Sequence, residues 1–171
     1  RFDAGGDPIR VGCGRDDELS GDVEHPDGQD VREFHIVMPS DIDYVPVLQA
    51  ATAKLASDLG FDDDAIELMG VALVEGAMNA IKHGNKYDLS KRVHLTLTVD
   101  STNLTIRIKD EGEGFDPEAV ASPFEGDNLF RDSGRGILMM NAYMDEVSHN
   151  EDGTELTIRK ERPDASGRVD S

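Results

Sequence analysis

Apolar side chains recur at helical spacing in two stretches of this 171-residue chain. Residues 41–60 begin with residues that can cap a helix, carry Pro46 in the expected first turn and end at Gly60, a pattern that predicts a helix. Residues 62–84 begin with three aspartates and end at Gly84, which predicts a second helix. The buried stripe of this second helix is predicted from the helical period to comprise Ile66, Met69, Leu73, Ala77 and Ile81.

A different pattern, with apolar residues at every second position, predicts strands in the rest of the chain. Residues 32–39 form one such strand, residues 92–110 read as a hairpin, and residues 145–161 read as a second hairpin. A short helix is predicted from Gly136. Helices near the start and hairpins after them indicate an α+β fold, a two-layer sandwich whose mixed, mostly antiparallel sheet is covered on one face by helices.

The composition changes near residue 31 and divides the chain into three parts. Residues 1–30 are rich in acids and glycine and poor in branched apolar residues, so we expect a disordered arm. Residues 31–161 are expected to form one folded domain. Residues 162–171 are expected to be a flexible tail.

The charge and the single cysteine exclude some classes of protein. The 36 acidic residues outnumber the 17 basic ones, and a formal net charge of −19 argues against nucleic acid as a partner. Cys13 is the only cysteine, which excludes an internal disulfide and fits a cytoplasmic location. We expect no membrane partner, because no apolar run approaches the ~20 residues of a membrane helix. The chain begins with Arg1, so the presence of an upstream domain stays an open question.

Polar residues interrupt the otherwise apolar second helix. Glu75 and Asn79 lie four residues apart and therefore share one face, which Lys82 extends toward the end of the helix. These three residues could form the solvated edge of an amphipathic helix. Alternatively, the amide oxygen could bind Mg²⁺, the carboxylate could accept a proton, and the ammonium could meet a phosphate.

Two glycine-containing motifs favour the functional alternative. The sequence DEGEG places Asp110 at the end of a strand, before Gly112 and Gly114. Such glycines let a flat ligand approach the backbone, and the aspartate can accept a hydrogen bond from an exocyclic amine such as that of adenine. The sequence SGRGILMM, residues 133–140, places two glycines before an apolar helix, where backbone N–H groups can bind phosphate. Taken singly, the first motif could be a turn and the second an ordinary helix start.

In this order the three motifs resemble those of the GHKL, or Bergerat, ATP-binding superfamily. Its members include gyrase-type topoisomerases, a heat-shock chaperone, mismatch-repair ATPases, histidine kinases and anti-sigma-factor serine kinases. The resemblance covers residues 32–161 and implies ATP and Mg²⁺ as cofactors, with Glu75 as the general base and Asn79 as the metal ligand. It also implies an ATP lid at residues 116–133. The residues that it implies to bind the nucleotide are Asn79, Lys82, Asp110, Gly112, Gly114, Arg131, Gly134, Arg135, Gly136 and Ile137.

The branch within the superfamily is indicated by chain length and by Glu75. Nothing in these residues resembles the added domains of the long members, and none of the five histidines is expected to lie on a dimerising helix pair. A serine hydroxyl needs a base more than an imidazole does, so Glu75 favours the anti-sigma-factor serine/threonine kinases. The sequence NAIKHG, residues 79–84, is similar to that of histidine kinases too.

The resemblance therefore implies an ATP-binding anti-sigma factor that phosphorylates a STAS-type anti-sigma-factor antagonist and binds a sigma factor. It also implies a possible homodimer, to which residues 31–38 are expected to contribute. Two alternatives stay open: a nucleotide-gated binding module with little turnover, and the ATP-binding output domain of a larger sensor.

Overall fold

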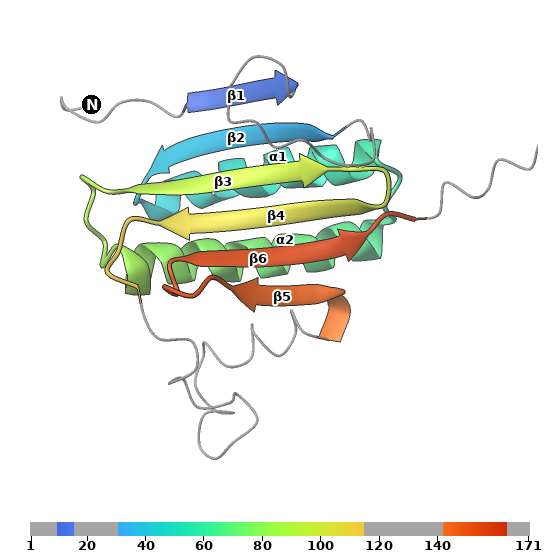
Figure 1. Ribbon diagram of the computed structural model, residues 1–171. Helices are drawn as coiled ribbons and strands as arrows, with labels where there is room; N and C mark the ends of the chain where they lie inside the picture. The colour runs from blue at the N-terminus through green and yellow to red at the C-terminus, as the bar shows by residue number, and fades with distance from the viewer. Residues whose placement is uncertain (1–9, 16–30, 115–141, 164–171) are drawn as a thin grey trace, which may run out of the picture.

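One antiparallel sheet and two helices form the two layers of the fold (Figure 1). The computed structural model describes residues 10–15, 31–114 and 142–163. In this part of the chain six strands are hydrogen-bonded in the order β1-β2-β3-β4-β6-β5, and every pairing is antiparallel. The strands are β1 (Arg10–Arg15), β2 (Arg32–Pro39), β3 (Arg92–Val99), β4 (Asn103–Asp110), β5 (Glu146–His149) and β6 (Glu155–Glu161).

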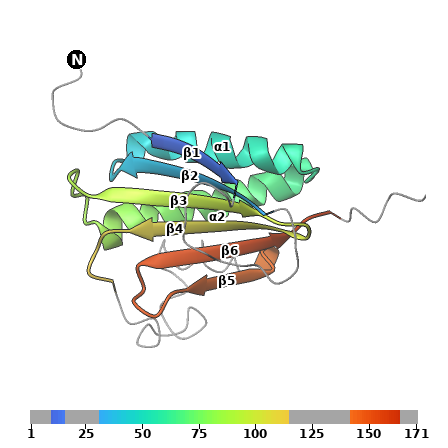
Figure 2. The ribbon, with the colours of Figure 1, turned by 45° about the horizontal axis from the view of Figure 1, so that its top comes forward.

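The helices lie between β2 and β3 in sequence and cover one face of the sheet (Figure 2). A short 3-10 turn, η1 (Ile42–Tyr44), leads into α1 (Val45–Asp58). The second helix, α2 (Asp63–Asn79), begins where the Asp62 carboxylate accepts a hydrogen bond from the Ala65 N–H at 2.8 Å. It continues into a π-helical turn, η2 (Ala80–Gly84). Neither α1 nor α2, the long helices of the described residues, is apolar and long enough to cross a membrane.

The core lies between the helices and the sheet, as the apolar patterns predict. Val93, Leu95 and Leu97 of β3 are buried and alternate with half-buried polar residues. The predicted stripe of α2 faces this core: Met69, Leu73, Ala77 and Ile81 are buried, and Ile66 is partly buried against them. The predicted strands are confirmed, and so are the two helices predicted over residues 41–60 and 62–84, although the second changes into a π-helical turn after Asn79.

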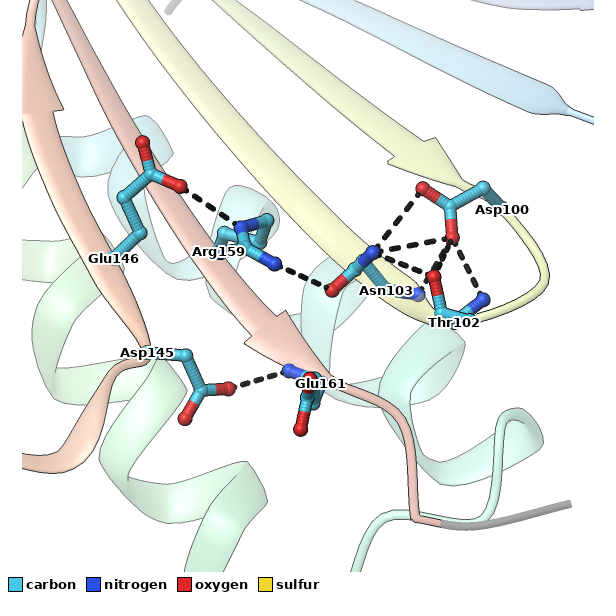
Figure 3. A network of polar contacts seen from close by, with 7 residues as sticks. All are labelled: Asp100, Thr102, Asn103, Asp145, Glu146, Arg159 and Glu161. Atoms are coloured by element: carbon cyan, nitrogen blue, oxygen red, sulfur yellow. Dashed lines mark hydrogen bonds and ion pairs between the residues drawn. The ribbon is translucent and has the colours of Figure 1, made fainter. Parts of the chain in front are cut away.

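A polar network connects both hairpins at the end of the sheet where β3 turns into β4 (Figure 3). Arg159 of β6 donates from Nε to Glu146 of β5 at 2.9 Å, and from Nη1 to the side-chain oxygen of Asn103 at 3.0 Å. Asp100 accepts hydrogen bonds from the backbone N–H groups of Thr102 and Asn103, both at 2.7 Å, and thereby closes the turn. These contacts connect β4, β6 and β5 side by side.

Several predictions about the periphery of the fold need correction. Residues 10–15, inside the segment expected to be disordered, form β1 and pair with β2 in register from Arg10↔Val37 to Arg15↔Arg32. The sheet was expected to be mixed, but the described pairings are all antiparallel. Arg162, placed in the flexible tail, donates from its backbone N–H to Thr102 at 2.7 Å and from its side chain to Asp100. The helix predicted from Gly136 begins outside the described residues.

The position of β1 also bears on the predicted dimer contact. Strand β2 pairs with β1 along one edge and with β3 along the other. A partner that contacted residues 31–38 would therefore meet side chains rather than a free edge of the sheet.

Helix α2 approaches the sheet closely at Gly76, and this approach yields a prediction about stability. A Cβ atom there would lie 2.7 Å from the side-chain tips of Ile108 on β4 and Leu156 on β6. Overpacking of this kind typically destabilises by ~1–3 kcal/mol. At Gly70, on the same helix, the nearest neighbour is the Gln49 side chain at 3.2 Å, which can move.

We expect Gly76→Ala to be less stable than Gly70→Ala by ~1–3 kcal/mol in urea unfolding. Both substitutions gain the same helix propensity, about 1 kcal/mol, so this gain cancels in the comparison. Equal stability of the two variants would show that Gly76 does not determine how closely α2 packs on β4 and β6.

Candidate functional site

The last turns of α2 carry the polar residues that interrupted its apolar pattern. Glu75 and Asn79 are both half-buried, as expected for one shared face. Burial raises the pKa of Glu75 above its ordinary value. The positive charges of Lys82 and His83 and a side-chain hydrogen bond from Asn79 oppose this shift. The structure therefore brings Glu75, Asn79 and Lys82 together, with a carboxylate that holds its proton more readily than one in water.

The α-helix ends at Asn79, earlier than the predicted end at Gly84, and changes into the π-helical turn η2. The Asn85 N–H donates to the Ala80 carbonyl at 2.8 Å, which closes this wider turn. The next two residues, Lys86 and Tyr87, have φ angles of 56° and 59°, uncommon for residues with a side chain. Wide turns and left-handed residues of this kind concentrate at functional sites.

Asp110 lies at the end of β4 and is only 8% exposed. Its Oδ1 accepts a hydrogen bond from the Gly112 N–H at 2.8 Å, and its own N–H donates to the Thr154 carbonyl at 3.0 Å. Burial raises the pKa of Asp110, although the Gly112 N–H and the charge of Lys91 act in the opposite direction. A buried carboxylate with few partners in the described residues can accept a hydrogen bond from a ligand.

The Asp110 carboxylate lies directly against the end of the π-helical turn. A Cβ atom at Gly84 would lie 2.2 Å from the Asp110 Cγ, and one at Gly112 would lie 2.3 Å from the Gly84 carbonyl oxygen. Only glycine fits at either position without displacing the backbone or the carboxylate. Two motifs more than 25 residues apart in sequence are thus in direct contact.

Gly114 connects the same loop to the β5–β6 turn. Its φ angle is 74°, in the left-handed region that favours glycine, and a Cβ atom there would overlap the Asp152 carbonyl oxygen. Glycine at this position thus permits both the backbone conformation and the close contact.

Asn85 was not predicted as part of the site, although the structure places it there. Its side chain is fully buried; Oδ1 accepts from the Glu111 N–H and Nδ2 donates to the Arg92 carbonyl, both at 2.8 Å. The available signal was an asparagine directly after a predicted helix end, which usually indicates a simple cap. Its partners are Arg92 at the start of β3 and Glu111 directly after β4, and the sequence alone does not show these contacts.

The second glycine motif and the lid lie outside the described residues. The predicted contacts there stay predictions, namely those of Arg131, Gly134, Arg135, Gly136 and Ile137.

A separate groove of about 370 Å³ lies on the face of the sheet opposite the helices. Its lining residues alternate with the buried core residues along β3, β4 and β6. Their side chains therefore project from the face of the sheet opposite to that of Asp110. The lining residues are His94, Thr96, Arg107, Lys109, Glu111 and Glu155. Glu111 alone among them belongs to the loop that follows Asp110, and this groove is not the site described above.

The donor set of the described residues suits a nucleotide accompanied by Mg²⁺. Asp110 offers a buried acceptor, which suits an exocyclic amine. Asn79 offers an amide oxygen beside the Glu75 carboxylate. Mg²⁺ commonly takes one or two protein oxygens and completes its shell with phosphates and water. No group of three or more potential metal-ligating side chains occurs in the described part of the chain.

Comparison with known proteins agrees with this geometry. The family model described as the histidine kinase-like ATPase domain matches residues 38–160. The serine-protein kinase RsbW of Halalkalibacterium halodurans is 28% identical over 146 residues, covering 80% of this chain and 89% of the relative. The protein of the same name from Bacillus subtilis is 27% identical over 130 residues, covering 72% and 81%. The predicted superfamily is confirmed, and the names of these relatives match the predicted serine-kinase branch.

The raised pKa of Asp110 predicts how stability depends on pH. Folding favours the protonated carboxyl, so the wild-type protein loses stability as pH rises through the folded-state pKa of Asp110. Asp110→Asn carries no such charge, and its free energy of unfolding relative to wild type should increase across the same rise in pH. Urea unfolding at a series of pH values measures this difference between variant and wild type. The contributions of the other carboxyl groups to the pH dependence cancel in it.

Asp88→Asn is the matched control because it should change stability in the opposite direction. Hydrogen bonds from Ser90 lower the pKa of the exposed Asp88, so its charge stabilises the fold increasingly as pH rises. Asp88→Asn should therefore lose stability relative to wild type as pH rises. A parallel response of both variants would contradict the assignment of Asp110 as a destabilising buried charge.

Proposed function

The chain belongs to the histidine kinase-like ATPase domain family, and from this premise we propose that it is an ATP-dependent serine/threonine protein kinase that acts as an anti-sigma factor. One observation carries the proposal: the Asp110 carboxylate is buried against Gly84, at the end of the segment that presents Glu75 and Asn79. A group that can recognise the base thus adjoins the segment with the groups that can act on the phosphates. The serine-protein kinases among its relatives support the choice of a hydroxyl as acceptor.

Each described residue has a proposed role that follows from its chemistry. Asp110 accepts a hydrogen bond from the adenine amine, beside Gly112 and Gly114. Asn79 offers its amide oxygen to Mg²⁺, and Lys82, which is exposed, can contact a phosphate.

Glu75 has the role of general base and removes the proton from the serine hydroxyl as the phosphoryl group transfers. Its pKa is raised by burial, and a carboxylate with a higher pKa is the stronger base. ATP is the substrate that supplies the γ-phosphoryl group, whose charge Mg²⁺ offsets. Arg131, Gly134, Arg135, Gly136 and Ile137 complete the proposed phosphate contacts.

The proposed protein substrate is a STAS-type anti-sigma-factor antagonist, and the proposed regulatory target is a sigma factor. We expect these encounters in the cytoplasm, with a homodimer as the functional unit. The support for these partners is the resemblance of the motifs to those of anti-sigma-factor serine kinases.

Substitutions at Glu75 and Asn79 separate chemistry from binding. Glu75→Gln should leave the Kd for ATP nearly unchanged and slow transfer by ~10²–10⁴-fold, the usual effect of losing a general base. Asn79→Ala removes a metal ligand, so it should weaken Mg²⁺-dependent ATP binding and transfer together. Titration calorimetry measures the first quantity, and label transfer from γ-labelled ATP to a serine of the antagonist measures the second.

Glu67→Gln is the matched control, since Glu67 is an exposed carboxylate on the same helix, α2. It should leave both quantities at wild-type values. Release of free phosphate without labelled antagonist would favour a nucleotide-gated binding module instead. Equal loss of ATP binding in Glu75→Gln and Asn79→Ala would remove the catalytic role from Glu75.

A further inference from the structure

The pairing of β3 with β4 stops at the site in an unusual way. The last pair in register is Val93 with Asp110. Continuing the ladder would bring Arg92 opposite Glu111, where antiparallel strands can exchange hydrogen bonds directly. Instead, the Asn85 side chain lies between these two residues.

The Asn85 amide takes the place of the missing backbone contact. Its Oδ1 accepts from the Glu111 N–H, and its Nδ2 donates to the Arg92 carbonyl, both at 2.8 Å. The donor and the acceptor that would have met each other thus each meet one end of a side-chain amide. The side chain is fully buried, so water cannot replace it there.

The Glu111 side chain completes the arrangement from the other direction. Its carboxylate accepts hydrogen bonds from the Arg92 N–H at 2.9 Å and contacts the His94 Nε2 at 2.9 Å. Both backbone groups of Arg92 are therefore bound by side chains. The chain separates from β3 at Glu111, immediately before the Gly112 N–H that holds the Asp110 carboxylate.

We infer that Asn85 is a positioning residue for recognition of the adenine base. It ends β3–β4 pairing at Asp110, fixes the Glu111 backbone, and thereby orients Gly112 and the carboxylate. This role rests on the proposed function, because it assumes that Asp110 binds the base. Asn85 itself touches neither the base nor the phosphates in this assignment.

The amide is chemically specific for this position, which makes the inference testable. Asn85→Asp keeps an acceptor for the Glu111 N–H but places an oxygen against the Arg92 carbonyl. Asn85→Ala removes both contacts and leaves two buried backbone groups without a partner. The effect of alanine should therefore be at least as large as that of aspartate.

The experiment measures Kd values for ATP, ADP and GTP with Mg²⁺ by titration calorimetry, in proteins shown by circular dichroism to be folded. Both Asn85 variants should bind ATP and ADP at least about tenfold more weakly, as expected when a displaced Asp110 carboxylate loses its charge-assisted hydrogen bond to the base. Their preference for ATP over GTP should also narrow. A merely structural role would lower the melting temperature without changing this preference.

Asn103→Asp and Asn103→Ala are matched controls at the opposite end of the same hairpin. The Asn103 amide also bridges separate partners, because it accepts from Arg159 at 3.0 Å and donates to Thr102 at 2.7 Å and, over longer distances, to Asp100 (Figure 3). These variants should lose stability while their nucleotide affinity and preference stay within about twofold of wild type.

Amide hydrogen exchange tests the positioning without any nucleotide. The Glu111 amide should exchange faster than in wild type in both variants, and faster in Asn85→Ala than in Asn85→Asp, which keeps an acceptor oxygen but loses the hydrogen bond to the Arg92 carbonyl. If wild type binds ATP and the folded Asn85 variants bind it equally well with the same preference, the inference is overturned and the proposed function stands. If wild type binds no adenine nucleotide, the proposed function fails, and with it the base-binding role of Asn85.

Discussion

The burial of the Asp110 carboxylate is the constraint on which the rest of the site depends. A carboxylate that loses most of its contact with water is stabilised only if backbone N–H groups or charges replace that water. Here the Gly112 N–H and the charge of Lys91 do so only in part, and the pKa of Asp110 is raised. Glycine is then required at position 84 because the Asp110 carboxylate fills the space that a Cβ atom would take there. It is required at position 112 because the Gly84 carbonyl fills the corresponding space. The buried Asp110 carboxylate thus lowers the stability of the fold locally, at a position where it can serve as an acceptor for a ligand.

The π-helical turn is the element that lets α2 meet this carboxylate. If the α-helix continued through Gly84, the residues after it would lie at other angles around the helix axis, because each residue of an α-helix turns by about 100°. The wider turn from Ala80 to Gly84 changes that phase directly after Asn79. Gly84 then packs on Asp110, while Asn85 enters the space between β3 and the chain after β4. The regular part of α2 orients Glu75 and Asn79, and the irregular part connects them to the sheet.

Periodicity was sufficient for the regular elements because one face of each is buried. The alternation around Leu95 and Ile106 and the helical spacing from Met69 to Ile81 both follow directly from contact with one core. Strand β1 was missed because RVGCGR has two glycines and little apolar alternation, so its pairing with β2 depends on the backbone. Asn85 was missed for a related reason, since its partners come from β3 and from the residue after β4. Gly84 was recognised as a helix end, whereas the structure shows that its small size serves the packing of Asp110.

The electrostatics of this protein explain why its nucleotide chemistry would depend on a cation. The formal net charge is −19, but charges in physiological salt are screened beyond about 8 Å, so nearby groups decide the interaction with an anion. The site lies at the C-terminal end of a helix, where the macrodipole contributes partial negative charge. Lys82 in the last turn offsets part of that charge, while Glu75 adds to it whenever it is ionised. The neutral amide of Asn79 suits the metal-binding role that we propose for it, because it offers an oxygen without placing a second negative charge beside Glu75.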